Sequence, residues 1–200
     1  LRPTWDQKLF DHYAQRFGFQ MKRRKKLRKV SSGQAAILTG AVALASGAPI
    51  TVLDEIHAPL DVPTRYAFYE ELLTLAADAM EGRRPRRTFL ISSHMVSELE
   101  NVAEDVVALK NGRLLAHESV ETFTSRICAI TGNAADVERF LIDHPGLDVI
   151  TSRTLGSARE IVVDLRGRGI SDREIASHSL TLSPCSFQDA FAYLIQEKDQ

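Results

Sequence analysis

The chain has 200 residues, of which 25 are Lys or Arg and 26 are Asp or Glu, so its formal net charge is −1. This balance gives no electrostatic reason to expect nucleic acid or an acidic substrate as the partner. The length suits one medium domain or two small ones. No apolar segment reaches the roughly 18 residues that a membrane span needs. Cys128 and Cys185 have no metal-binding spacing, which favours a reducing cytosolic compartment.

The N-terminal segment combines a short amphipathic pattern with a block of positive charge. Apolar residues recur at helical spacing from Gln7 to Phe17 and predict a helix. Residues 22–29 are almost all basic, which invites a nucleic-acid interpretation. No aromatic residues are interleaved to stack on bases, so a solvated, charged connector is the simpler interpretation.

Small hydroxyl residues and a glycine open the next helical pattern. Val30-Ser31-Ser32-Gly33-Gln34 precedes an Ala- and Leu-rich stretch from Ala35 to Ala45. Free backbone N–H groups and the helix dipole favour an anion at such a helix start. A serine that only caps the helix explains the same residues. Both interpretations stay open on these residues alone.

A short apolar run that ends in two carboxylates is the centre of the sequence. Pro49 to Leu53 predicts a parallel strand buried on both faces, with Asp54 and Glu55 at its carboxyl end. Open α/β sheets bind ligands at that end. Because side chains alternate along a strand, the two acids should point in different directions. One could hold a magnesium ion or its water shell while the other reaches a water molecule, and a solvated acidic turn is the alternative.

The remaining elements alternate between helices and strands. We predict a helix over Arg65–Met80, a strand over Thr88–Ile91 that leads into Ser92-Ser93-His94, and a hairpin over Val106–Leu115 with Asn111-Gly112 as its turn. A βαββαβ order follows, which is typical of a ferredoxin-like domain. Its predicted elements are Ile127–Thr131, Ala135–Ile142, Leu147–Ile150, Glu160–Leu165, Asp172–His178 and Leu180–Ser183, with a terminal helix over Ser186–Glu197.

The order of these motifs resembles the ATP-binding subunit of ABC transporters. Val30–Gln34 looks like the signature motif of that family, and Val52–Glu55 looks like its Walker B strand with the catalytic Glu. Ala58–Asp61 looks like the D-loop, and His94 falls at the switch histidine. The ending Leu182–Phe191 is similar to ATPases of export systems, as is Trp5-Asp6.

The resemblance implies an α/β fold: a partial P-loop NTPase (RecA-like) core with a helical segment, followed by a small α+β ferredoxin-like accessory domain. We expect the two domains at residues 1–120 and 121–200. The implied cofactors are ATP and Mg2+. Asp54 would hold the metal, Glu55 would polarise the attacking water and His94 would contact the γ-phosphate. Ser31, Ser32, Gly33 and Gln34 would close over ATP bound to the opposite subunit, and Asp61 would link the two sites.

The same resemblance implies partners and a location. The partners would be a second ATP-binding subunit, identical or different, and an integral membrane permease subunit, with no nucleic acid expected. The chain would lie in the cytoplasm, peripheral on the inner face of the cell membrane, and would take part in export.

The phosphate-binding sequence of the family, Gly-x-x-x-x-Gly-Lys-Ser/Thr, does not occur in the 200 residues. We therefore expect the chain to be the later portion of an ATP-binding subunit. The alternative is a naturally truncated, non-hydrolysing protein that docks on an ABC ATPase or a membrane subunit. An ABC-type ATPase that acts on DNA or ribosomes is a second alternative, against which the export-like ending argues.

Three residues after Glu55 depart from the family pattern. Ile56 stands where a proline is usual, and His57 and Pro59 replace small residues or glycine. These changes would alter the geometry of the D-loop without removing a reacting group. We interpret His57, like the histidines other than His94, as an ordinary surface or core residue.

Overall fold

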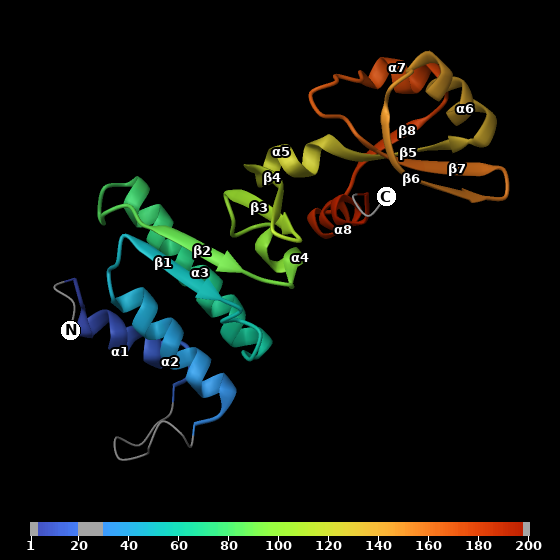
Figure 1. Ribbon diagram of the computed structural model, residues 1–200. Helices are drawn as coiled ribbons and strands as arrows, with labels where there is room; N and C mark the ends of the chain where they lie inside the picture. Colours follow the sequence, from blue (N-terminus) through green and yellow to red (C-terminus); the bar gives the residue numbers. More distant parts are fainter. Residues whose placement is uncertain (1–3, 20–29, 198–200) are drawn as a thin grey trace. The chain divides into compact units, whose positions relative to one another are not determined.

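The computed structural model describes residues 4–19 and 30–197 (Figure 1). The basic run at residues 22–29 lies outside the described residues. The fold is mixed α/β, and the chain divides into two compact units, Leu1–His94 and Met95–Gln200. None of the helices in the described ranges is long and apolar enough to cross a membrane.

The described residues of the first unit form three helices and two strands. In chain order they are α1 (Gln7–Arg16), α2 (Ser32–Ala45), β1 (Ile50–Asp54), α3 (Val62–Met80) and β2 (Thr88–Ser92). All five were predicted from the sequence within a few residues. The start of α3 is earlier than predicted because Asp61 caps the helix and Pro63 fits its first turn.

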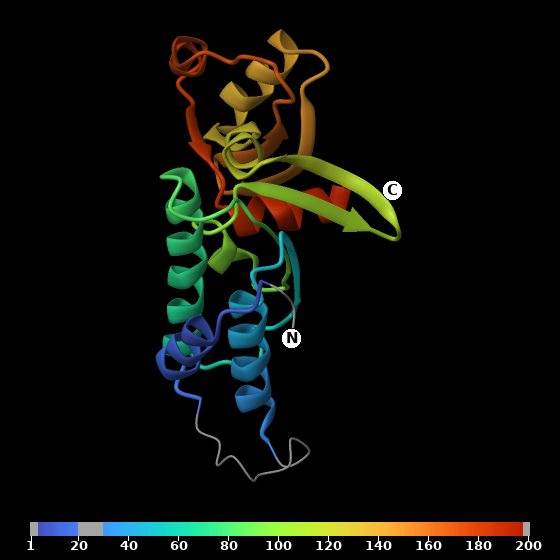
Figure 2. The ribbon, with the colours of Figure 1, turned by 90° about the vertical axis from the view of Figure 1, so that its left-hand side faces the viewer.

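The core of the first unit is built from aromatic rings on α1 and α3. The Tyr13 and Phe17 rings stack with centroids 6.0 Å apart, and Phe17 lies 5.6 Å from Phe68. Helices α2 and α3 run alongside each other (Figure 2). Gly40 permits their close approach, because a Cβ at this position would lie 3.1 Å from Phe68 Cε2.

Arg87 closes the carboxyl end of α2. Its half-buried guanidinium donates hydrogen bonds to the carbonyl oxygens of Ala43, Leu44 and Ala48 at 2.8–3.1 Å, and to Thr51 Oγ1 at 3.1 Å. Burial lowers the pKa of Arg87. A cation at a helix carboxyl end satisfies otherwise unpaired carbonyl groups and complements the helix dipole. This contact joins the segment before β2 to the helix that precedes β1.

Strands β1 and β2 are parallel, as predicted, with Asp54 opposite Ser92 at the end of the register. The prediction that β1 is buried on both faces is wrong. Leu53 is buried, whereas Val52 is 69% exposed and its neighbour Leu90 on β2 is 52% exposed. Within the described residues β2 pairs with β1 and with no other strand. The apolar run therefore covers a core on one face and carries exposed apolar side chains on the other.

The second unit begins with a short helix and a hairpin. Helix α4 (Val96–Leu99) precedes the antiparallel pair β3 (Asp105–Lys110) and β4 (Arg113–Ser119). The predicted turn is confirmed, because Asn111 and Gly112 have φ of 49° and 73°, in the left-handed region that such a two-residue turn requires. Helix α5 (Val120–Arg126) follows.

The predicted ferredoxin-like topology is confirmed. The elements are β5 (Ile127–Asn133), α6 (Ala134–Asp143), β6 (Asp148–Leu155), β7 (Ala158–Asp164), α7 (Asp172–Ser177), β8 (Thr181–Pro184) and α8 (Phe187–Glu197). The sheet order is β6-β7-β5-β8, and all neighbouring strands are antiparallel. Alternate residues of β7 pack on opposite faces. Ile161 belongs to the buried cluster that includes Phe140 of α6, and Val162 belongs to the cluster that includes Leu194 of α8.

The hairpin β3–β4 packs within the second unit. Ala108 and Ala116 belong to one buried cluster with Phe123 of α5 and Leu194 of α8. For this reason the compact units divide after His94, before the hairpin, although the sequence analysis groups the hairpin with the first domain. The domain boundary at residue 120 stays a prediction.

The ring of His178, the residue after α7, lies between two hydrogen-bond acceptors. Its Nδ1 lies 3.0 Å from the Glu174 carbonyl oxygen and Nε2 lies 2.9 Å from Asp143 Oδ2. When protonated, the ring can donate to both acceptors. The hydrogen bond to the Asp143 carboxylate, followed by that to the Glu174 carbonyl, raises the pKa of His178 above its ordinary 6.5.

We expect Asp143→Asn to lower the pKa of His178 toward its ordinary value, as measured by NMR titration of the ring. Because the folded-state pKa is raised, the stabilising contribution is complete below the unfolded-state pKa and is lost as pH rises through the folded-state value. The variant should therefore flatten the pH dependence of the melting temperature in that interval. Asp148→Asn, at an exposed position on β6, is the charge-matched control. An unchanged pKa of His178 in Asp143→Asn would contradict the assignment.

Candidate functional site

The carboxyl ends of β1 and β2 bring the candidate catalytic residues together. Asp54 is the last residue of β1, and the chain turns at Glu55, which has a φ of 46°. Ser92 Oγ donates a hydrogen bond to Asp54 Oδ1 at 2.5 Å and accepts one from the Glu55 backbone N–H at 3.0 Å. The turn at Glu55 is thus fixed against the end of the neighbouring strand.

Glu55 and His94 form a direct pair. His94 Nδ1 lies 2.8 Å from Glu55 Oε2, and their side chains are 70% and 41% exposed. The carboxylate can accept a proton or orient a water molecule, and the imidazole can donate a hydrogen bond to an anion. Because both groups are exposed, a ligand and a water molecule can reach them from solvent.

The four residues of the signature-like motif lie at the amino end of α2. Ser31 caps this helix, and its Oγ accepts from the Gln34 backbone N–H at 3.3 Å. Ser32 is exposed at the first helical position. A Cβ at Gly33 would lie 3.1 Å from the Pro59 carbonyl oxygen, so glycine permits the helix start to approach the D-loop-like segment. Ser31 is therefore the N-cap of α2.

Asp61 caps α3 at the end of the same D-loop-like segment. Its Oδ1 accepts from the Thr64 backbone N–H at 2.9 Å, and the side chain is exposed. Hydrogen bonds from the side chain and the backbone of Thr64 lower the pKa of Asp61. The carboxylate is therefore held ionised and fixed in direction at the surface. Asp54, Glu55 and His94 form one group, and the motif at residues 31–34 forms a second beside residues 59–61. The roles given to these residues remain predictions.

The donor set at the strand ends fits a magnesium ion bound together with phosphates. Mg2+ commonly takes one or two carboxylates and completes its shell with water and substrate phosphate oxygens. Asp54 offers one carboxylate beside the Ser92 hydroxyl. Over residues 4–19 and 30–197 no three His, Cys, Asp or Glu side chains gather as a metal-binding cluster.

Sequence reasoning missed the residues that support the pair. Ser92 and Ser93 were noted only as the approach to His94. His57, which we interpret from the sequence as an ordinary surface or core residue, is a core residue, since it is fully buried. Its Nε2 lies 2.6 Å from Ser93 Oγ, a contact that the sequence does not predict. The available signal was the position of His57 two residues after Glu55, where the family pattern has a small residue.

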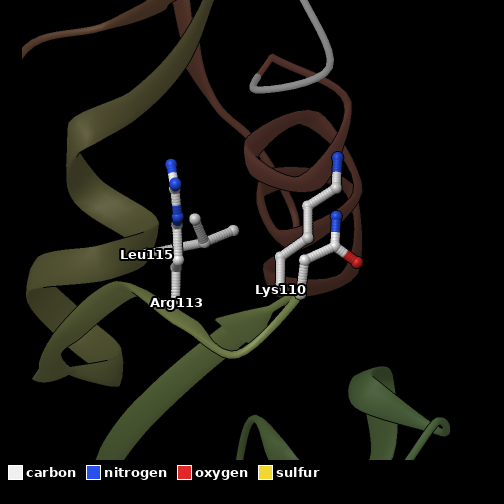
Figure 3. Close-up of a pocket in the computed structure, with 4 residues that line it drawn as sticks. Lys110, Arg113 and Leu115 are labelled. Atoms are coloured by element: carbon white, nitrogen blue, oxygen red, sulfur yellow. The ribbon is translucent and has the colours of Figure 1, made fainter.

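A separate hollow of about 340 Å³ lies at the tip of the β3–β4 hairpin. Lys110, Asn111, Arg113 and Leu115 line it (Figure 3). Lys110 Nζ donates to the Ile195 carbonyl oxygen at 2.5 Å, so the lysine serves the last turn of α8. The candidate catalytic residues do not line this hollow.

Comparison with known proteins agrees with the fold. A solved structure of a cobalt transport ATP-binding protein superposes with a TM-score of 0.51 and 18% sequence identity, over 92% of this chain and 57% of that one. The chain thus shares part of the fold of that protein. No protein-family model matches the chain.

Curated sequences show a similarity over part of the chain. Nod factor export ATP-binding protein I of Neorhizobium galegae is 32% identical over 87 residues, which are 44% of this chain and 23% of that protein. The ATP-dependent lipid A-core flippase of Xylella fastidiosa is 33% identical over 87 residues, 44% of this chain and 13% of that protein. The chain is therefore similar to part of each of these two transport proteins. It spans about a quarter or less of the curated relatives it matches.

Proposed function

We propose that this chain is part of the ATP-binding subunit of an ABC exporter, which hydrolyses ATP to drive transport through a separate membrane subunit. The observation that carries the proposal is the 2.8 Å pair between Glu55 and His94 at the ends of two parallel strands. Asp54 lies beside it in the same register. Asp54 can hold a metal, Glu55 can act as a base toward water and His94 can donate a hydrogen bond to phosphate. These three groups are adjacent.

Each residue has a distinct role in this proposal. Asp54 would hold the Mg2+ ion, which would neutralise charge on the phosphates. Glu55 orients the attacking water and accepts its proton. His94, held by Glu55, donates a hydrogen bond to the γ-phosphate. Hydrolysis therefore depends on the two strand ends staying in register.

The amino end of α2 serves the nucleotide of the opposite subunit. Ser31 to Gln34 would direct hydroxyl and backbone N–H groups at its γ-phosphate, with the helix dipole behind them. Asp61, fixed as the cap of α3, links the two sites across the subunit interface. The partner is a second ATP-binding subunit, and the pair works on a membrane permease at the cytoplasmic face of the membrane. Export is supported by the name of the Neorhizobium relative.

A non-hydrolysing role is the second candidate. It would have the chain dock on an ABC ATPase or a membrane subunit without binding ATP itself. The exposed apolar side chains of Val52 and Leu90 favour contact with further protein. In either case the phosphate-binding loop is not among these 200 residues.

We therefore expect no saturable binding of Mg-ATP by the 200-residue chain in isothermal titration, because the loop that cradles the β- and γ-phosphates is absent from it. Circular dichroism should first establish that the material is folded. Saturable binding in the micromolar to millimolar range would contradict the requirement for a phosphate-binding loop from elsewhere.

A further inference from the structure

His57 is a buried polar residue next to the candidate catalytic pair. Its side chain is fully buried, and its ring centroid lies 6.2 Å from that of Tyr69 on α3. The backbone makes two successive turns here, with hydrogen bonds from Ala58 N to the Glu55 carbonyl and from Leu60 N to the His57 carbonyl. These turns carry the side chain of His57 inward while Glu55 stays at the surface.

Three successive residues, Ser92, Ser93 and His94, join the end of β2 and the segment after it to the end of β1 and the segment after that strand. Ser92 binds Asp54 and the Glu55 backbone, and His94 binds Glu55. Between them, His57 Nε2 lies 2.6 Å from Ser93 Oγ. The middle contact is the one whose histidine is fully buried, so water does not compete at that ring.

An exposed side chain needs a fixed backbone to hold a catalytic geometry. The His94 side chain is 70% exposed, so little packing restrains it. Ordering such a side chain costs conformational entropy, which a fixed neighbouring residue reduces. Ser93 is that neighbour, and its hydroxyl is held by a hydrogen bond to the buried ring of His57.

We propose that His57 is a positioning residue that fixes the backbone at Ser93 and thereby holds His94 against Glu55. Its importance for hydrolysis rests on the proposed function. The His57–Ser93 hydrogen bond also connects the D-loop-like segment, which ends at Asp61, to the segment that carries His94. A displacement of the first segment is thereby passed to the second.

The test measures how much the Glu55 carboxylate changes the NMR chemical shift of the His94 ring. The ring resonance of His94 is recorded by NMR on the 200-residue chain with and without Glu55→Gln. We expect this change in chemical shift to fall by roughly twofold or more in His57→Phe, which keeps a ring but cannot hydrogen-bond to Ser93. His57→Gln, whose amide can reach the hydroxyl, should restore most of the response. His117→Phe, at an exposed position on β4, should leave it unchanged.

Ser93→Ala breaks the same hydrogen bond without touching the buried ring and should reproduce the loss. If His57→Phe fails to fold, Ser93→Ala alone tests the proposal. A full change in the His94 chemical shift in Ser93→Ala would overturn the proposal. Equal losses of that change in His57→Gln and His57→Phe, together with a full change in Ser93→Ala, would also overturn it.

A kinetic comparison separates this inference from the proposed function. In a complete ATP-binding subunit, His57→Phe should lower kcat by roughly tenfold to a hundredfold, since small misplacements of catalytic groups have effects of that size. KM for ATP should change little, and His57→Gln should recover part of the rate. If the complete subunit hydrolyses no ATP, the proposed function fails, and the NMR comparison still decides whether His57 positions His94.

Discussion

Glu55→Gln is expected to lower kcat for ATP hydrolysis by roughly a hundredfold or more in a complete ATP-binding subunit, meaning a polypeptide with these residues and a phosphate-binding loop. The amide can still accept a hydrogen bond from His94 and orient water, but it cannot take the proton. ATP binding should persist because Asp54 is unchanged. Phosphate release measures the first effect and equilibrium nucleotide binding the second.

The variant should also accumulate as an ATP-bound dimer, visible by size-exclusion chromatography with Mg-ATP. Glu70→Gln is a suitable control. Glu70 is an exposed acid in the middle of α3, away from the cap residue Asp61, and it pairs with Arg16. Hydrolysis by Glu55→Gln at the unaltered rate would mean that Glu55 is not the catalytic carboxylate.

Ser31→Arg is expected to stop hydrolysis to a similar extent by a different route. Ser31 is exposed at the start of α2. A long guanidinium there would occupy the place proposed for the γ-phosphate of the opposite subunit. Nucleotide binding to the single subunit should persist, because Asp54 lies at the strand ends. Binding and hydrolysis assays on the same preparation separate the two effects.

Ser31→Ala is the matched control for the capping role. Loss of the hydrogen bond to Gln34 N should cost about 0.5–2 kcal/mol of stability and lower the melting temperature. If Ser31 serves only as a cap, both variants should melt early and Ser31→Arg should have no special effect on turnover. A normal melting temperature together with lost hydrolysis in Ser31→Arg supports the site between subunits.

Local patterns predicted most of the elements. The family resemblance implied that Asp54, Glu55 and His94 serve one ATP site. The structure brings Glu55 and His94 to 2.8 Å at the ends of two parallel strands. Asn111-Gly112 has a conformational requirement that few dipeptides meet, so it identified its turn. The βαββαβ order likewise left few topologies to consider.

The rest depends on contacts between distant parts of the chain. The run at Ile50–Leu53 consists of apolar or β-branched residues, so its composition could not reveal that Val52 is exposed. That outcome depends on which elements cover the sheet. His57 shows no ligand spacing in the sequence, and its role depends on Ser93, 36 residues away. Arg87 likewise finds its carbonyl partners at the end of α2, more than 35 residues earlier.

The most direct test of the shared nucleotide site mixes two inactive subunits. A Ser31→Arg subunit is combined with one whose phosphate-binding loop is disabled, so that a homodimer can contain one intact composite site and one doubly broken site. We expect ATP hydrolysis from the mixture and none from either variant alone. For this test the two variants must be well folded and must form mixed dimers, as native mass spectrometry would show. If such mixtures hydrolyse no ATP in any ratio, the result contradicts independent sites built from Asp54, Glu55 and His94 of one subunit and Ser31 of the other.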